Sequence, residues 1–99
     1  MMMAHDSHAN GPRLSAEAVA DLQRALDTYV SDQKADGLQR CLQRTAVEAR
    51  ERKMHAEQLL LALKDVWYGL PHLQDKAGEE QTRLLQRVVS MCIREYYGG

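Results

Sequence analysis

The chain has 99 residues, a length typical of one domain, and its composition already excludes several classes of protein. Ala, Glu, Lys, Leu and Arg make up 45 of the 99 residues, whereas Val and Ile together contribute seven and Phe is absent. This balance favours helices over a β-rich core. Thirteen basic and fourteen acidic residues give a net charge of −1, so no strong overall field attracts nucleic acid or an anionic membrane. A hydrophobic fraction of 44% is too high for a wholly disordered chain.

Signals for secretion or membrane insertion are not apparent in the sequence. The longest purely apolar run, residues 59–63, has five residues, whereas a membrane-spanning helix needs about 20. The first residues lack the basic region and apolar stretch of a secretory signal peptide. Cys41 and Cys92 are 51 positions apart and belong to no disulfide framework, which is typical of reduced thiols. We therefore expect a cytoplasmic protein without a membrane partner.

Residues 1–13 contain Gly and Pro but no apolar period, and they predict a flexible N-terminal tail. A single helical domain is expected over residues 14–99, because no internal repeat or Gly/Ser-rich linker divides it. Ser15 is a favourable helix N-cap. Apolar side chains then recur at helical spacing and predict a first helix that ends near Gln33. These side chains are Val19, Leu22, Leu26, Tyr29 and Val30.

A second helix is expected to begin at Asp36, whose side chain can cap it while Gln39 completes a capping box. Its apolar stripe consists of Leu38, Cys41, Leu42, Thr45, Ala46 and Ala49. His55 and Gln58 can cap a third helix in the same way, but no Gly or Pro forces a break before them. The apolar stripe even continues in phase through residues 56–67. We favour a break near His55 and leave open that the two helices are one.

Gly69 and Pro71 are typical of a helix end and close the third segment. A polar loop leads to a C-terminal helix, whose first turn carries Glu79 and Glu80 at the end where the helix dipole favours negative charge. Amphipathic segments with short connections favour antiparallel neighbours, and the apolar run at residues 59–63 is typical of the most buried helix. The sequence therefore predicts an all-α fold, a small three- or four-helix bundle.

The C-terminal helix has a wide apolar face that divides into two adjacent seams. One seam consists of Leu85, Val89 and Cys92, and the other of Leu84, Val88 and Met91. If one seam faces the core, the other can face a second chain, since small helical domains often gain burial by pairing. We expect Leu84, Val88 and Met91 to contact a partner and a homodimer to form. The alternative is a central helix that is covered on both sides within one chain.

The polar side of the same helix carries a row of side chains that we call the arginine stripe. It consists of Arg83, Arg87, Ser90, Arg94 and Tyr97, at positions i, i+4, i+7, i+11 and i+14 of one helix face. Arginine guanidinium groups bind carboxylates and phosphates through two parallel hydrogen bonds. Tyr97 is a candidate anchor, because tyrosine is enriched in the energetic centres of protein interfaces. The stripe thus suits an acidic protein partner or a nucleic-acid backbone, and a solvated helix face is the remaining alternative.

Residues 45–64 can be aligned with a helix-turn-helix, which makes nucleic-acid binding the alternative function. The outward positions of the supposed recognition helix would include Leu60 and Leu61. A helix that reads base edges needs Arg, Asn, Gln or Ser at such positions. A protein partner is therefore the favoured interpretation.

No motif in the sequence indicates catalysis, a cofactor or a metal. His55 and Glu57 match the first half of the zinc deaminase motif, but the P-C-x-x-C half is missing. The two Cys and four His residues lack the spacing of a structural zinc site. Cys41 lies on an apolar face and is expected to be buried rather than nucleophilic. We therefore expect a protein-interaction module that self-associates and acts as an adaptor or regulator, not an enzyme.

Overall fold

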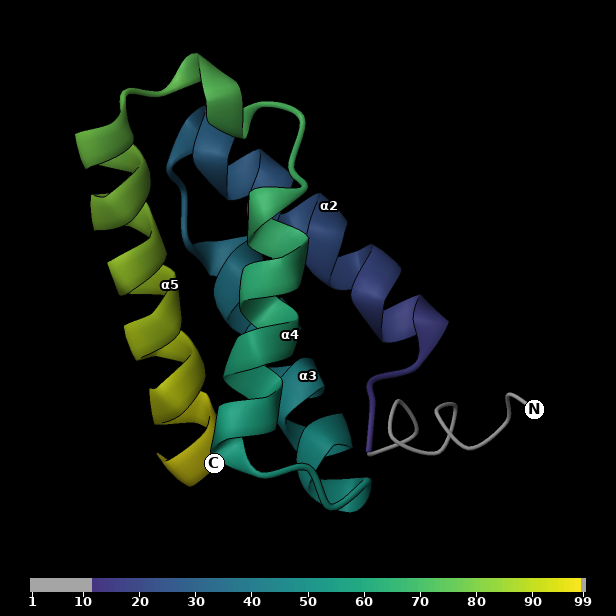
Figure 1. The fold of residues 1–99 in the computed structure, drawn as a ribbon. Coiled ribbons are helices and arrows are strands. Elements are labelled where there is room, and N and C mark those ends of the chain that lie inside the picture. Colours follow the sequence, from purple (N-terminus) through teal and green to yellow (C-terminus); the bar gives the residue numbers. More distant parts are fainter. Residues whose placement is uncertain (1–11, 99) are drawn as a thin grey trace.

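The computed structural model describes residues 12–98, which contain four α-helices and one short 3₁₀ helix (Figure 1). The elements are α2 (Ala16–Asp32), α3 (Asp36–Glu51), α4 (Ala56–Tyr68), η1 (Leu73–Asp75) and α5 (Gly78–Gly98). No strand occurs in this range, so the predicted all-α bundle is confirmed. Residues 1–11 of the predicted tail, and Gly99, lie outside the described residues. None of the described helices is both long enough and apolar enough to cross a lipid bilayer.

Each of the four helices packs on two others, and their apolar faces meet in one core. Both α2 and α5 pack against α3 and α4. In Figure 1, α4 and α5 run side by side in opposite directions, and η1 lies in the loop that joins them. The largest fully buried side chains are Trp67, Leu22, Leu26, Leu38, Leu42, Leu59, Leu63, Leu84, Val30, Val88 and Cys92. Burial of this apolar surface stabilises the short helices more than their intrinsic propensity does.

Both predicted ends of α2 are confirmed. Ser15 Oγ accepts a hydrogen bond from the backbone N–H of Ala18 at 3.1 Å, as expected of an N-cap. Gln33 ends the helix in the left-handed region, with φ 59°, and its N–H donates to the carbonyl of Tyr29 at 2.7 Å.

The start of α3 differs from the prediction. Ala35 is the N-cap residue, and no side chain caps the helix. Asp36 lies one position later, in the first turn, where its negative charge is favourable for the helix dipole. The expected capping box of Asp36 and Gln39 is therefore wrong, because Ala35 already has a helical backbone (φ −92°, ψ −10°).

A turn at residues 52–55 separates α3 from α4, so the favoured break is confirmed. Lys53 adopts a left-handed backbone, with φ 63°. The N–H of Met54 donates back to the carbonyl of Ala49 at 2.9 Å, as in a Schellman helix ending. His55 is the N-cap of α4, and its backbone N–H donates to Gln58 Oε1 at 2.8 Å. The turn thus reverses the chain without a Gly or Pro.

The loop between α4 and α5 is attached to α2 through an ion pair. The Nδ1–H of His72 donates to Asp27 Oδ1 at 2.8 Å and lies 3.0 Å from Oδ2. This hydrogen bond, together with the charge of Asp27, raises the pKa of His72 above its ordinary value of 6.5. Leu70 and Leu73, on either side of His72, are buried in the core and hold the loop in place.

We expect Lys53→Gly to stabilise the protein by about 0.5–1 kcal/mol, because a left-handed backbone is strained for a residue with a Cβ atom and not for glycine. The free energy of unfolding in urea measures the change. Lys53→Ala is the matched control, since it removes the same side chain but keeps the Cβ atom. Equal free energies of unfolding for Lys53→Gly and Lys53→Ala would show that the left-handed backbone at this position is not strained.

We expect the ion pair of His72 and Asp27 to stabilise the protein at low pH. Because the pKa of His72 is raised on folding, its contribution is complete below pH 6.5 and is lost as the pH rises through the raised pKa. The free energy of unfolding of the wild type minus that of Asp27→Asn should therefore fall between about pH 6 and pH 8. If the difference in the free energy of unfolding stays constant over this pH interval, the charge of His72 does not contribute to stability through Asp27.

Candidate functional site

An open groove of about 400 Å³ runs along α5, beside residues from the end of α2 and from the α2–α3 connection. We call it the arginine groove. Its lining residues are Tyr29, Ala35, Arg83, Gln86, Arg87, Ser90, Met91 and Arg94. The structure thus brings together the predicted Arg83, Arg87, Ser90 and Arg94. It adds Tyr29 and Ala35, which the sequence did not indicate because both precede the helix that carries the stripe.

The side chains of the groove differ in polarity between its floor and its edge. Met91 is partly buried against the core and supplies accessible apolar surface, whereas Tyr29 is only 2% exposed and closes the base of the groove. Arg83, Arg87 and Arg94 are all exposed. Successive residues of an α-helix rise by about 1.5 Å, so these three positions are separated by about 6 Å and 10 Å along α5. An extended or helical segment that lies along α5 can therefore contact all three.

Arg83 already has an acidic neighbour within the chain. Its Nη2 lies 3.3 Å from Glu80 Oε2, one turn earlier on α5. The same Glu80 oxygen accepts a hydrogen bond from Gln33 Nε2 at 3.3 Å. Because the pair is exposed and Glu80 is shared, this salt bridge contributes little to stability and partly neutralises the start of the groove.

Arg87 and Arg94 carry the uncompensated positive charge of the groove. Within residues 12–98, no carboxylate lies within 4 Å of either guanidinium group, and neither donates a hydrogen bond to another side chain or to a carbonyl. Both groups are thus free to bind an incoming carboxylate or phosphate through two hydrogen bonds.

The C-terminal end of α5 is fixed by two contacts with the α3–α4 region. Arg50 Nη1 donates to the carbonyl of Tyr96 at 2.6 Å and places positive charge at the end of α5, where the helix dipole is negative. The hydroxyl of Tyr96 donates to the carbonyl of Met54, also at 2.6 Å. Tyr97 packs edge-to-face on Tyr96 and is 72% exposed, but it does not line the groove.

The predicted partner seam of α5 requires a correction. Leu84 and Val88 are fully buried, together with Cys92, so they form the side of α5 that faces the core. Only Met91 of that seam stays accessible, as part of the arginine groove. The other seam is divided, since Cys92 is buried whereas Leu85 and Val89 are only partly buried and lie farther out. Since α5 packs against both α3 and α4, the alternative of a helix covered on both sides agrees with the structure.

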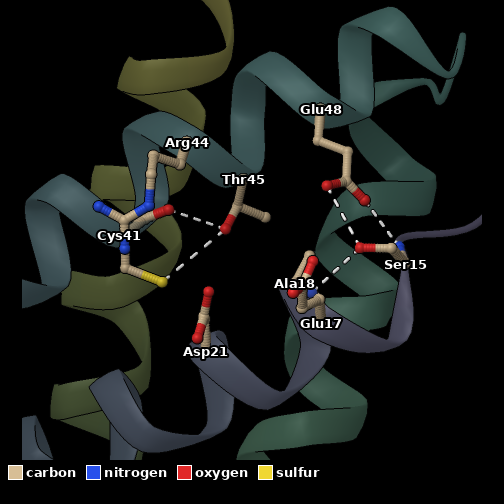
Figure 2. Close-up of a pocket in the computed structure, with 8 residues that line it drawn as sticks. All are labelled: Ser15, Glu17, Ala18, Asp21, Cys41, Arg44, Thr45 and Glu48. Carbon is tan, nitrogen blue, oxygen red and sulfur yellow. Dashed lines mark hydrogen bonds between the residues drawn. The ribbon is translucent and has the colours of Figure 1, made fainter.

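A second, smaller pocket of about 140 Å³ lies between α2 and α3 (Figure 2). Its polar groups bond mainly to one another. Glu48 accepts hydrogen bonds from the N–H and Oγ of Ser15 at 2.7 and 3.3 Å, and Thr45 Oγ1 donates to the carbonyl of Cys41 at 2.8 Å. The bonds between Ser15 and Glu48 attach the start of α2 to α3, whereas the Thr45 bond lies within α3. The contacts in this pocket are thus structural.

Both cysteine thiols are unsuited to nucleophilic chemistry. Cys41 is 2% exposed, as predicted, and burial raises its pKa above 9.0, although Thr45 and Arg44 oppose the shift. Burial raises the pKa of Cys92 to about 11. Both thiols therefore stay protonated at neutral pH. In the described part of the chain, no three or more His, Cys, Asp and Glu side chains are grouped so as to hold a metal ion.

The outer side of α4 also differs from the prediction. The run at residues 59–63 predicts the most buried helix, yet α4 buries only Leu59, Leu63 and Trp67, whereas α3 buries six residues. Leu61, in the middle of the run, is 65% exposed. Tyr68, seven positions later on the same helix, is 67% exposed. The helical spacing within the run already indicated that Leu61 is exposed, because Leu61 lies on the opposite face from Leu59, Leu63 and Trp67.

Comparison with known proteins finds no matching family, no matching curated protein and no matching solved structure. The function is therefore inferred from the geometry of the chain itself.

The burial of the two α5 seams predicts unequal effects of truncation. Leu84→Ala should lower the free energy of unfolding by about 2–5 kcal/mol, because it leaves a cavity in the core. Leu85→Ala, one position later and only partly buried, should cost clearly less. Urea unfolding of both variants at one protein concentration measures the difference. Similar costs for the two variants would show that α5 is rotated from the orientation described.

Proposed function

We propose that this chain is a cytoplasmic interaction module without catalytic activity, which binds an acidic segment of a protein partner in the arginine groove. The observation that carries this function is the pair Arg87 and Arg94, which line one groove without an acidic neighbour among residues 12–98. Arg83, by contrast, is paired with Glu80 on the same helix. A cytoplasmic location suits the two buried free thiols.

The floor of the groove favours a protein segment over a nucleic-acid backbone. Met91 offers apolar contact between Arg87 and Arg94, above the buried Tyr29. An apolar floor with a charged edge matches the core and rim of protein interfaces. A phosphodiester backbone presents no apolar side chains to such a floor.

Acidic residues at the start of α5 also favour a protein segment over nucleic acid. Glu79 and Glu80 occupy the first turn, one turn away from Arg83. A nucleic-acid duplex carries continuous negative charge and would meet these carboxylates as it followed the helix. A short acidic segment can end before them. Carboxylates seven residues apart on a partner helix would match the spacing of Arg87 and Arg94.

A fluorescein-labelled helical peptide, with Glu at every seventh position and Leu beside it, tests this function by fluorescence anisotropy. We expect Arg87→Gln/Arg94→Gln to weaken its binding by about 5- to 30-fold, the factor for about 1–2 kcal/mol from two exposed charge pairs. The control Arg24→Gln/Arg40→Gln changes the net charge equally on α2 and α3 and should bind as the wild type does. A second control peptide carries Gln in place of Glu.

Two results would contradict this function. One is equal affinity of the groove variant and the wild type for the Glu peptide. The other is displacement of the peptide by a mixed-sequence DNA duplex, with a binding constant whose logarithm falls linearly with the logarithm of the salt concentration. That second result would instead support the nucleic-acid-binding regulator.

A further inference from the structure

The side of α4 that points away from the core carries both apolar and charged residues. Leu61 and Tyr68 are 65% and 67% exposed. Glu57 and Lys64 lie on the same helix face, because positions 57, 61, 64 and 68 are separated by four, three and four residues. We call these four residues the α4 outer face. Exposed leucine and tyrosine at heptad spacing are typical of a helix face that packs against another helix.

The opposite side of α4 is buried in the core. Leu59, Leu63 and Trp67 are buried, and α4 packs against α2 and α5 through this side. The rotation of α4 is therefore fixed, and the outer face cannot turn inward without exposing the indole of Trp67.

The two charged groups of the outer face have no partner within residues 12–98. Neither Glu57 nor Lys64 forms an ion pair or a side-chain hydrogen bond there. They are seven positions apart, too far for an intrahelical pair, which forms at spacings of three or four. Opposite charges thus stand on the two sides of Leu61.

This charge pattern is complementary to itself when two helices run antiparallel. Glu57 precedes Leu61 by about 6 Å along the axis, and Lys64 follows it by about 4.5 Å. A two-fold axis at Leu61 would therefore place Glu57 of each copy beside Lys64 of the other, forming two equivalent ion pairs. Parallel helices would instead bring like charges together.

We propose that the α4 outer face joins two copies of this chain in an antiparallel homodimer, with Leu61 at the two-fold axis. Leu61 packs against Leu61 of the second copy, and the Glu57–Lys64 pairs on both sides fix the direction of the helices. Tyr68 extends past the start of the second copy's α4 and covers the turn before it. The arginine groove lies on α5 and takes no part, so this dimer does not rest on the function proposed above.

The contact of one helix pair is small, and the dimer is accordingly weak. Interfaces below about 1,200 Å² belong to transient complexes. We expect the wild type to sediment as a monomer–dimer mixture at protein concentrations on the order of 100 µM and as a monomer after strong dilution.

Charge exchange across the two-fold axis tests the arrangement by sedimentation velocity. Glu57→Lys alone and Lys64→Glu alone place like charges opposite each other, and each should weaken dimerisation by roughly tenfold or more. An equimolar mixture of these two variants restores both ion pairs, and it should form a heterodimer as readily as the wild type forms a homodimer. Leu61→Glu should abolish association in every combination. Circular dichroism of each variant shows that its helices are retained.

Three outcomes would overturn the dimer. The wild type stays monomeric up to concentrations on the order of 1 mM, and the face then serves another partner or only solvent. The wild type dimerises but all three substitutions leave the dimer unchanged, so another surface joins the copies. The single variants dissociate but their mixture does not associate, so the helices do not cross antiparallel at Leu61.

Discussion

The rotation of α5 about its own axis is the constraint on which the surface of this protein depends. Leu84, Val88 and Cys92 recur every four residues and are all buried, so this line of α5 has to face α3 and α4. A shift of one residue would turn the helix by about 100° and move the line out of the core. A shift by one residue toward the N-terminus would also bring Arg83 and Arg87 toward the interior, where an unpaired charge costs several kcal/mol.

The same rotation of α5 places its arginines in the arginine groove. With the buried line fixed, Arg87 and Arg94 project beside the end of α2, and Met91 supplies accessible apolar surface between them. The far end of α5 cannot slide, because Arg50 binds its last carbonyls. The groove is thus built mainly from packed helices, with Ala35 of the α2–α3 connection at its edge, which favours a preformed binding surface.

Two surfaces of different chemistry lie on different helices of this bundle. The arginine groove on α5 is cationic with an apolar floor, whereas the α4 outer face is apolar with one charge of each sign. A partner on one surface leaves the other accessible. A weak dimer that presents two grooves would bind a partner with two acidic segments more tightly than a monomer does, because the second contact becomes intramolecular.

The sequence by itself determined the local features of this protein. The extent of the helices followed from apolar spacing and, except at the start of α3, from caps. The common face of Arg83, Arg87 and Arg94 followed from helical periodicity, since both depend on residues a few positions apart. The tertiary structure alone decided which apolar side chains are covered. Leu84 is buried and Leu85 only partly buried because of where the neighbouring helices approach, and that depends on contacts between residues far apart in the chain.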